Sequence, residues 1–271
     1  MLNMHVNDLV QCVDGQLFGQ LDGLVSVTSA AIDSRRIKQG SLFIAFKGEQ
    51  VDGHDYLSAA ANNGAIVALV ESVKSEIALP QIKVKSCQQA MANIAISCRK
   101  KYSGTVIAIT GSCGKTSCKE MLASILRVSN VVSVTAGNQN NELGVPLTLF
   151  SIDDKSDYAV IEMGAAEQGD ISYLMKMVDP DVSAISNIRP AHIGRFGSEE
   201  TIAQTKSEIY RDLKSSATAV VNRDEKYSGQ WLEALVNKKQ RVMSFSAEHQ
   251  NAAVYISDVT IELHQSTFIL H

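Results

Sequence analysis

The sequence lacks the features that mark several large protein classes. Its cysteines form no CxxC pair and have no histidine cluster beside them, so a zinc site is not expected. No stretch approaches the roughly 20 apolar residues of a membrane span, and the N-terminus lacks the basic start and apolar segment of a signal peptide. Internal repeats and low-complexity tracts are also missing. With five cysteines at irregular spacing, the chain is expected to keep reduced thiols in the cytoplasm, without membrane insertion.

Neither sign of charge is in large excess. The chain has 25 Lys and Arg against 29 Asp and Glu, a formal net charge of −4. This balance gives no electrostatic reason to expect nucleic acid or an anionic membrane as a partner. With 271 residues, 45% of them hydrophobic, the chain fits an ordinary globular protein of one or two domains. Any anion site must therefore be local, made by a loop.

Strand and helix patterns alternate along most of the chain. In the first part, two apolar runs at Ser41–Phe46 and Ala65–Val70 flank a short helical segment, Tyr56–Asn63. A connecting helix at Cys87–Tyr102 follows. The β-branched run Thr105–Thr110 then begins a series of strands alternating with helices, which favours βαβ units. We therefore predict an α/β fold with a mostly parallel sheet in its larger part.

Two domains are expected, residues 1–82 and residues 83–271, with a hinge near Pro80–Lys85. The last stretch, Val254–Leu263 and Ser266–Leu270, alternates apolar and polar residues and predicts an antiparallel strand pair. Because the sequence stops within this β pattern, we expect the second domain to be incomplete.

A glycine turn joins the strand Thr105–Thr110 to a predicted helix, Lys115–Leu126. The turn has the short form GxxGKT, because Ile109 stands where the full Walker pattern has its first glycine. Small residues let backbone N–H groups approach phosphate oxygens, and the helix N-terminus favours anions. Lys115 would reach the β- and γ-phosphates, and Thr116 would offer its hydroxyl to magnesium. The predicted ATP-binding residues are Gly111, Ser112, Cys113, Gly114, Lys115, Thr116 and Ser117. The plainer alternative is a glycine turn with a surface lysine.

Segments beyond this turn resemble the Mur ligase family, and the MurF-type members in particular. Gly137–Thr148 (GNQNNELGVPLT) is similar to their GNxNNxxGxPLT stretch, and Ile161–Ala165 (IEMGA) to their E-[LM]-G-A strand end. Ala191–Ser198 (AHIGRFGS) and Lys206–Ile209 (KSEI) resemble their AHxxxFGS and KxEI motifs. The first part of the chain adds DSR from Asp33, GSLFIAFKG from Gly40 and DGH from Asp52, which resemble the uridine-nucleotide domain shared by MurE- and MurF-type ligases.

The resemblance implies an ATP-dependent ligase of peptidoglycan precursor synthesis. Such an enzyme phosphorylates the terminal carboxylate of UDP-MurNAc-tripeptide, and the amine of D-Ala-D-Ala then displaces phosphate from the acyl phosphate. Both steps concentrate negative charge, so cations and fixed donors supply most of the catalysis. It also implies an N-terminal UDP-precursor domain, a central ATPase domain, a monomer, and a C-terminal Rossmann-like domain that this chain does not contain. We therefore expect that the chain cannot ligate alone.

The resemblance also assigns roles to single residues. Thr116, Glu162, His192 and Lys206 would hold two magnesium ions, Lys206 after carbamylation, and Lys115, His192 and Lys206 would act in catalysis. The ordinary alternatives are a solvated carboxylate, a structural histidine and a surface lysine. The residues implied for substrate binding are Asp33, Ser34 and Arg35, the weaker candidates Lys47, Asp52 and His54, and three asparagines, Asn138, Asn140 and Asn141. Asparagine is also common in turns for conformational reasons.

Other functions remain open at this stage. A MurE-type ligase and a folylpolyglutamate synthase are related amide-forming enzymes, although the Asp33–Arg35 and IEMGA segments disfavour the latter. A non-catalytic nucleotide-binding fragment is a further alternative. A P-loop kinase or GTPase is disfavoured by the shortened loop. Cys113 stands where these loops commonly have a polar residue, and a thiol at a helix N-terminus beside Lys115 is expected to be reactive.

Overall fold

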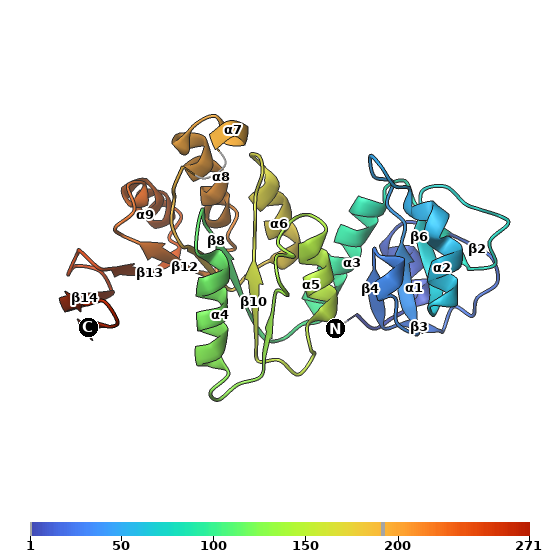
Figure 1. Ribbon diagram of the computed structural model, residues 1–271, viewed down its shortest axis with the longest axis horizontal. Helices are drawn as coiled ribbons and strands as arrows, with labels where there is room; N and C mark the ends of the chain where they lie inside the picture. Colours follow the sequence, from blue (N-terminus) through green and yellow to red (C-terminus); the bar gives the residue numbers. More distant parts are fainter. Residues whose placement is uncertain (1, 191–192) are drawn as a thin grey trace. The chain divides into compact units, whose positions relative to one another are not determined.

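The computed structural model describes residues 2–190 and 193–271, and the chain divides into two compact units (Figure 1). The first unit comprises Met1–Ser103 and Glu142–Ser156, and the second comprises Gly104–Asn141 and Asp157–His271. The expected functional division at residues 82 and 83 stays a prediction. The compact units follow a different boundary, because α3 (Cys87–Lys101) and α5 (Gly144–Ser151) pack against each other within the first unit.

A five-stranded sheet forms the centre of the first unit, in the order β2, β7, β6, β5, β4. The β2–β7 pair is antiparallel and the other pairs are parallel. The strands are Gln16–Phe18 (β2), Ser29–Ala31 (β4), Ser41–Ile44 (β5), Ala65–Val70 (β6) and Gln81–Lys83 (β7), beside a short antiparallel pair, Met4–His5 (β1) and Ser26–Val27 (β3). The remaining helical segments are Val6–Cys12 (α1), Leu57–Asn62 (α2) and the 3₁₀ turns Ser34–Arg36 (η1) and Gly53–Tyr56 (η2).

Strand β7 occupies the segment where a hinge was expected. It is hydrogen-bonded to β2 on one side and to β6 on the other. The Ala68 N–H donates to the Pro80 carbonyl at 2.8 Å, and the Val84 N–H donates to the Val70 carbonyl at 2.9 Å. A segment fixed on both sides cannot readily absorb the backbone rotation that a hinge requires, so this position argues against a hinge there.

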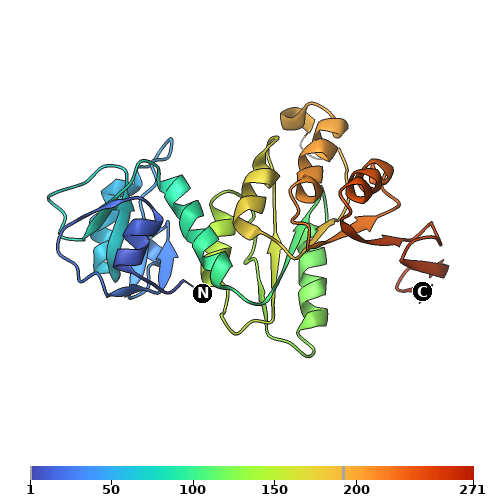
Figure 2. The same ribbon diagram turned by 180° about the vertical axis from the view of Figure 1, so that it is seen from behind.

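The second unit contains an eight-stranded sheet in the order β15, β14, β13, β12, β11, β8, β10, β9. All neighbouring pairs are parallel except β14–β15. The strands are Thr105–Thr110 (β8), Val132–Val134 (β9), Tyr158–Glu162 (β10), Val182–Ile185 (β11), Thr218–Asn222 (β12), Arg241–Ser246 (β13), Val254–Ile261 (β14) and Ser266–Leu270 (β15). The helices that flank them are Lys115–Leu126 (α4), Asp170–Val178 (α6), Ile193–Phe196 (α7), Glu199–Arg211 (α8) and Ser228–Asn237 (α9) (Figures 1 and 2).

The sequence of β8 does not alternate between apolar and polar residues, because both faces of the strand are buried. Ile107 and Ile109 pack on one face with Val160 and with Leu122 and Leu126 of α4. The alternate residues Val106 and Ala108 are also buried. Burial on both faces is typical of a parallel sheet covered by helices. The predicted α/β class is therefore confirmed. The antiparallel strand pair predicted for the last stretch of the sequence is also confirmed, by β14 and β15.

The strand order changes direction at β8. The chain first builds β9 and β10 on one side of β8, and then β11, β12 and β13 on the other. In open α/β sheets, ligands bind outside the carboxyl ends of the strands at such a switch point. The loop after β8 and the ends of β10 and β11 lie at this edge. In the described part of the chain, no helix is long and apolar enough to cross a membrane.

Candidate active site

The loop between β8 and α4 depends on two glycines. Gly111 has φ of 149° and Gly114 has φ of 71°, a region that L side chains rarely adopt. A Cβ at Gly111 would lie 1.9 Å from Ser186 Oγ, so a side chain there would strain the backbone and displace Ser186. Gly114 caps α4 without a side-chain hydrogen bond, which leaves the first-turn N–H groups of α4 without an acceptor from the cap. This is the arrangement that binds anions at helix N-termini.

The end of β11 fixes the shape of this loop. The Cys113 N–H donates to Asn187 Oδ1 at 3.0 Å, and the Cys113 carbonyl accepts from Ser186 Oγ and Asn187 Nδ2, each at 2.9 Å. The Ser112 N–H donates to the Asn187 carbonyl at 2.9 Å, and Ser112 Oγ accepts from the Arg189 N–H at 3.0 Å. These bonds hold the loop in one shape.

Glu162, at the carboxyl end of β10, faces the start of α4. Its side chain is buried, at 1% exposure. One carboxylate oxygen accepts from the Thr116 hydroxyl at 2.8 Å, and the other accepts from Asn140 Nδ2 at 2.8 Å. A carboxylate and a hydroxyl in contact beside a phosphate-type loop are the hard oxygen donors that suit magnesium. The residues present therefore fit that ion.

Lys115 and Lys206 approach the same loop from two helices. Lys115 Nζ donates to the Gly111 carbonyl at 2.9 Å. Lys206, on α8, is buried at 4% exposure, and its pKa is lowered to about 8 by burial and secondarily by the positive charge of Lys115. Since a buried ammonium beside a second ammonium is disfavoured, Lys206 is more easily deprotonated than an ordinary lysine.

Two buried polar side chains of α8 hold Lys206 in place. Glu208 accepts from the N–H groups of Gly169 and Ser172, at 2.8 and 2.9 Å, at the start of α6. The Tyr210 hydroxyl accepts from the Ile185 N–H at 3.0 Å and donates to the Val220 carbonyl at 2.6 Å. The helix that carries Lys206 is therefore tied to α6, β11 and β12.

The other residues predicted for this site are placed differently. Of the three asparagines, Asn140 contacts Glu162, while Asn138 and Asn141 are exposed. Ser117 is exposed in the first turn of α4. His192 lies outside the described residues, so its predicted role as a metal ligand stays a prediction.

A separate pocket lies in the first unit. It encloses about 520 Å³, which is within the usual size of small-molecule sites. Asp33, Ser34 and Arg35 line it together with Gly53 and the aromatic and aliphatic side chains of Ile32, Phe43, Phe46, Val51 and Tyr56. The Arg35 guanidinium donates to both oxygens of Asp33, at 2.9 and 2.8 Å, and these bonds lower the pKa of Asp33 to about 2. The predicted trio is thus brought together at a pocket with an apolar wall.

The three weaker candidates form a structural cluster beside that pocket. Lys47 and Asp52 form an isolated β-bridge. Buried His54 has Nδ1 2.6 Å from Asp52 Oδ1, and its Nε2 accepts from the Glu71 N–H at 3.2 Å. Because Nε2 accepts, Nδ1 carries the hydrogen. His54 therefore holds the 52–54 turn against the end of β6, and a role in substrate binding stays a prediction for these residues.

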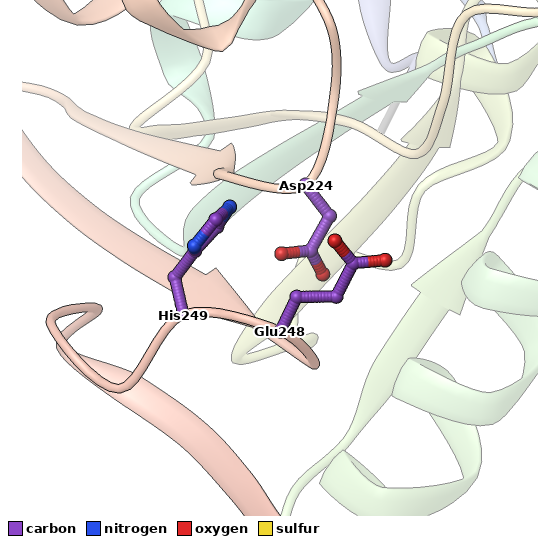
Figure 3. Close-up of side chains that lie close together, drawn as sticks. All are labelled: Asp224, Glu248 and His249. Carbon is purple, nitrogen blue, oxygen red and sulfur yellow. The ribbon is translucent and has the colours of Figure 1, made fainter.

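A third group of polar side chains lies after β12 and β13. Figure 3 shows Asp224, Glu248 and His249 gathered between two loops, with one ligand atom of each within 4.8 Å of the others. Asp224 accepts from the Ser246 hydroxyl and from the Ala247 N–H. These bonds give the carboxylate a structural role in closing the loop after β13.

Several residues of the main site were not anticipated from the sequence. Ser186 and Asn187 directly follow β11, which pairs with β8. Polar residues at the end of a strand that neighbours β8 could have indicated a contact with the loop after β8. Lys119 of α4, whose buried Nζ donates to the Thr135 carbonyl at 2.7 Å, gave no such signal, since a lysine on a helix is usually exposed.

A short glycine loop at the switch point, facing a buried carboxylate, defines a P-loop α/β protein. The Mur ligase middle domain matches residues 109–271, and the catalytic domain of the Mur ligase family matches residues 26–99. The chain belongs to the Mur ligase family. The expected resemblance is thereby confirmed.

Individual relatives agree with this assignment. A UDP-N-acetylmuramoyl-tripeptide–D-alanyl-D-alanine ligase of Haemophilus influenzae is 39% identical over 88% of this chain and 52% of its own length. A crystal structure of MurF from Acinetobacter baumannii has a TM-score of 0.89 and 34% identity, over 99% of this chain and 58% of that one. MurF ligase from Thermotoga maritima in complex with ADP has a TM-score of 0.77 and 31% identity, over 90% and 56%. The chain spans between half and three fifths of the length of these relatives.

Proposed function

We propose that this chain supplies the nucleotide and UDP-precursor sites of an ATP-dependent ligase that joins D-Ala-D-Ala to UDP-MurNAc-tripeptide. The observation that carries the proposal is the contact between Thr116 and the buried carboxylate of Glu162, beside Lys115 and a loop whose backbone angles favour glycine. We take the two substrates from the relatives, which are named as ligases of UDP-N-acetylmuramoyl-tripeptide and D-alanyl-D-alanine or as MurF. The cysteines are free, which suits action in the reducing cytoplasm.

In the first step, an oxygen of the precursor carboxylate bonds to the γ-phosphorus of ATP, and the bond to the leaving ADP oxygen breaks. The first-turn N–H groups of α4 and the Lys115 ammonium stabilise the charge on the phosphates. Thr116 and Glu162 would hold a magnesium ion that neutralises part of this charge. Besides the bond that Lys115 Nζ donates to the Gly111 carbonyl, the ammonium has further N–H groups that can donate to a phosphate.

In the second step, the amine of D-Ala-D-Ala attacks the acyl carbon, and the tetrahedral intermediate expels phosphate to give the amide. We propose that Lys206, carbamylated, supports a second magnesium ion together with His192. The lowered pKa of Lys206 supports this role, because only the neutral amine reacts with carbon dioxide. A carbamate also replaces a positive charge, which would repel the metal, with a negative one.

The UDP-precursor site is proposed at the pocket lined by Asp33, Ser34 and Arg35. Arg35 has an exposed side chain, 86% accessible, that Asp33 holds in a fixed orientation. A guanidinium can form two parallel bonds to a diphosphate. The apolar wall of the pocket suits the uracil ring.

Phosphate release from Mg-ATP tests the reaction. The chain is given UDP-MurNAc-tripeptide with and without D-Ala-D-Ala, and Lys115→Met serves as the control. Release that requires both substrates supports the ligase and contradicts the expectation that the chain cannot ligate alone. Absence of release, with the precursor bound in calorimetry, supports the binding sites without the full reaction. Equal release without any precursor would contradict the proposal.

A further inference from the structure

Lys119 is a charged side chain with no exposed surface, and the steps proposed above do not use it. It lies on α4, three residues after Thr116 and four before the buried Ala123. Residues spaced three and four apart share a face of a helix, so Lys119 lies beneath the magnesium-binding end of α4. Burial of an ammonium is costly unless it is paired and hydrogen-bonded. Its partners therefore indicate its role.

The Lys119 ammonium has two polar partners. Its Nζ donates to the Thr135 carbonyl at 2.7 Å and lies 3.0 Å from an oxygen of Glu120, whose side chain is half exposed. The first contact is the buried one. Thr135 comes directly after β9 and is itself fully buried.

Thr135 connects Lys119 to the candidate magnesium ligands. Its Oγ1 accepts from the Glu162 N–H at 3.0 Å, and the Glu162 carboxylate accepts from the Thr116 hydroxyl at 2.8 Å. Thr116 and Lys119 belong to the same helix. The bonds thus form a closed circuit from α4 to the end of β9, to the end of β10 and back to α4.

We propose that Lys119 is a positioning residue for the magnesium–nucleotide site, acting through Thr135 on Glu162. This inference rests on the proposed function of that site. Metal ligands must be held within about 0.5 Å of their working geometry. The circuit does this because the backbone of Glu162 and the helix that carries Thr116 are both hydrogen-bonded to Thr135. Outer-shell groups of this kind typically change metal affinity by about tenfold to a hundredfold.

Calorimetric titration of the chain with Mg-ADP tests this role in four variants. Lys119→Met removes the donor and keeps the apolar stem, and Thr135→Val removes the hydroxyl with little change of shape. Both should weaken Mg-ADP binding by about tenfold or more and raise the Mg²⁺ concentration needed for half-saturation. Thr135→Ser should restore affinity to within about threefold of the native chain. Glu120→Gln should stay within about twofold, because the circuit does not pass through Glu120.

A double variant, Lys119→Met with Thr135→Val, should bind no more weakly than the worse single variant, since both break one circuit. Native-like Mg-ADP affinity in Lys119→Met and Thr135→Val, with only a lower melting temperature, would overturn the inference. If Lys119→Met fails to fold, the Thr135→Val and Thr135→Ser pair decides, because these changes are small. Failure of the native chain to bind Mg-ADP would overturn the proposed function and this inference together.

Discussion

Lys206 is a lysine whose surroundings disfavour its charge. With its pKa lowered to about 8, about a quarter of the amine is neutral at pH 7.5, against roughly a thousandth for an unperturbed lysine. The family resemblance pointed to this lysine, but only its burial on α8 explains why its amine loses a proton more easily than that of an ordinary lysine. The sequence alone could equally describe a surface lysine.

Carbon dioxide should therefore react with Lys206 in preference to the other lysines. Supplied with ¹³C-bicarbonate, the native chain should show a Lys206 carbamate carbon signal by NMR, beside that of the N-terminal amine, that grows as the pH rises from 6 to 8, where the neutral amine accumulates. Lys206→Met should lose the signal, while a change at the exposed Lys100, Lys100→Met, should keep it. A native chain without a carbamate signal at pH 8 would contradict the prediction.

Cys113 is the second residue with a direct test. Its thiol is exposed in the loop that is proposed to hold phosphate, and Cys118 is also exposed, one turn into α4. Alkylation with N-ethylmaleimide should block Mg-ADP binding, and prior addition of Mg-ATP should slow the block. Cys113→Ser should resist the reagent, while Cys118→Ser should remain sensitive. Equal loss of Mg-ADP binding in the native chain and in Cys113→Ser would contradict the prediction.

At the level of elements, the best-predicted parts of the fold are those whose sequence and burial agree. The β8 strand and the α4 helix begin and end where expected, because an apolar β-branched run meets a glycine turn and then a helical pattern. Helix α5 was missed, since Pro146 disfavours a helix in isolation. Here the proline stands in the first turn, where its missing N–H costs little.

The last part of the second unit was also incompletely predicted. Helix α9 buries only Trp231 and Leu235, which is too weak a stripe to identify from sequence. Strand β13 alternates exposed and partly buried residues and begins with a charged arginine. The stability of such elements depends on the strands and helices that pack against them, and the pattern of a single sequence does not show which elements these are.

Gly111 is one of the two glycines with positive φ in the β8–α4 loop. Gly111→Ala should destabilise the chain by about 1–3 kcal/mol, because the methyl group meets Ser186 and φ of 149° is strained for alanine. It should also abolish detectable Mg-ADP binding in calorimetry. Gly229→Ala, in the open first turn of α9, should be neutral or stabilising by up to about 1 kcal/mol in urea unfolding. Similar stability and affinity for both variants would show that the loop tolerates a side chain.

For the whole molecule, the sequence predicted two α/β parts and assigned one proposed site to each. It did not show that α3 and α5 pack within the first unit, because motif order along the chain says nothing of which helices meet. The pocket proposed for the UDP-precursor lies wholly within the first unit and the Thr116–Glu162 pair wholly within the second. Each site can therefore be disabled without touching the other.

Calorimetric titration of the chain with UDP-MurNAc-tripeptide tests directly whether the pocket of the first unit binds the precursor. We predict saturable binding of one ligand per chain, weakened about tenfold or more by Arg35→Ala through loss of charge-assisted bonds. Glu162→Gln, in the second unit, should leave this affinity within about twofold. No heat of binding from the native chain, or equal affinity in Arg35→Ala, would contradict the placement of the UDP-precursor site.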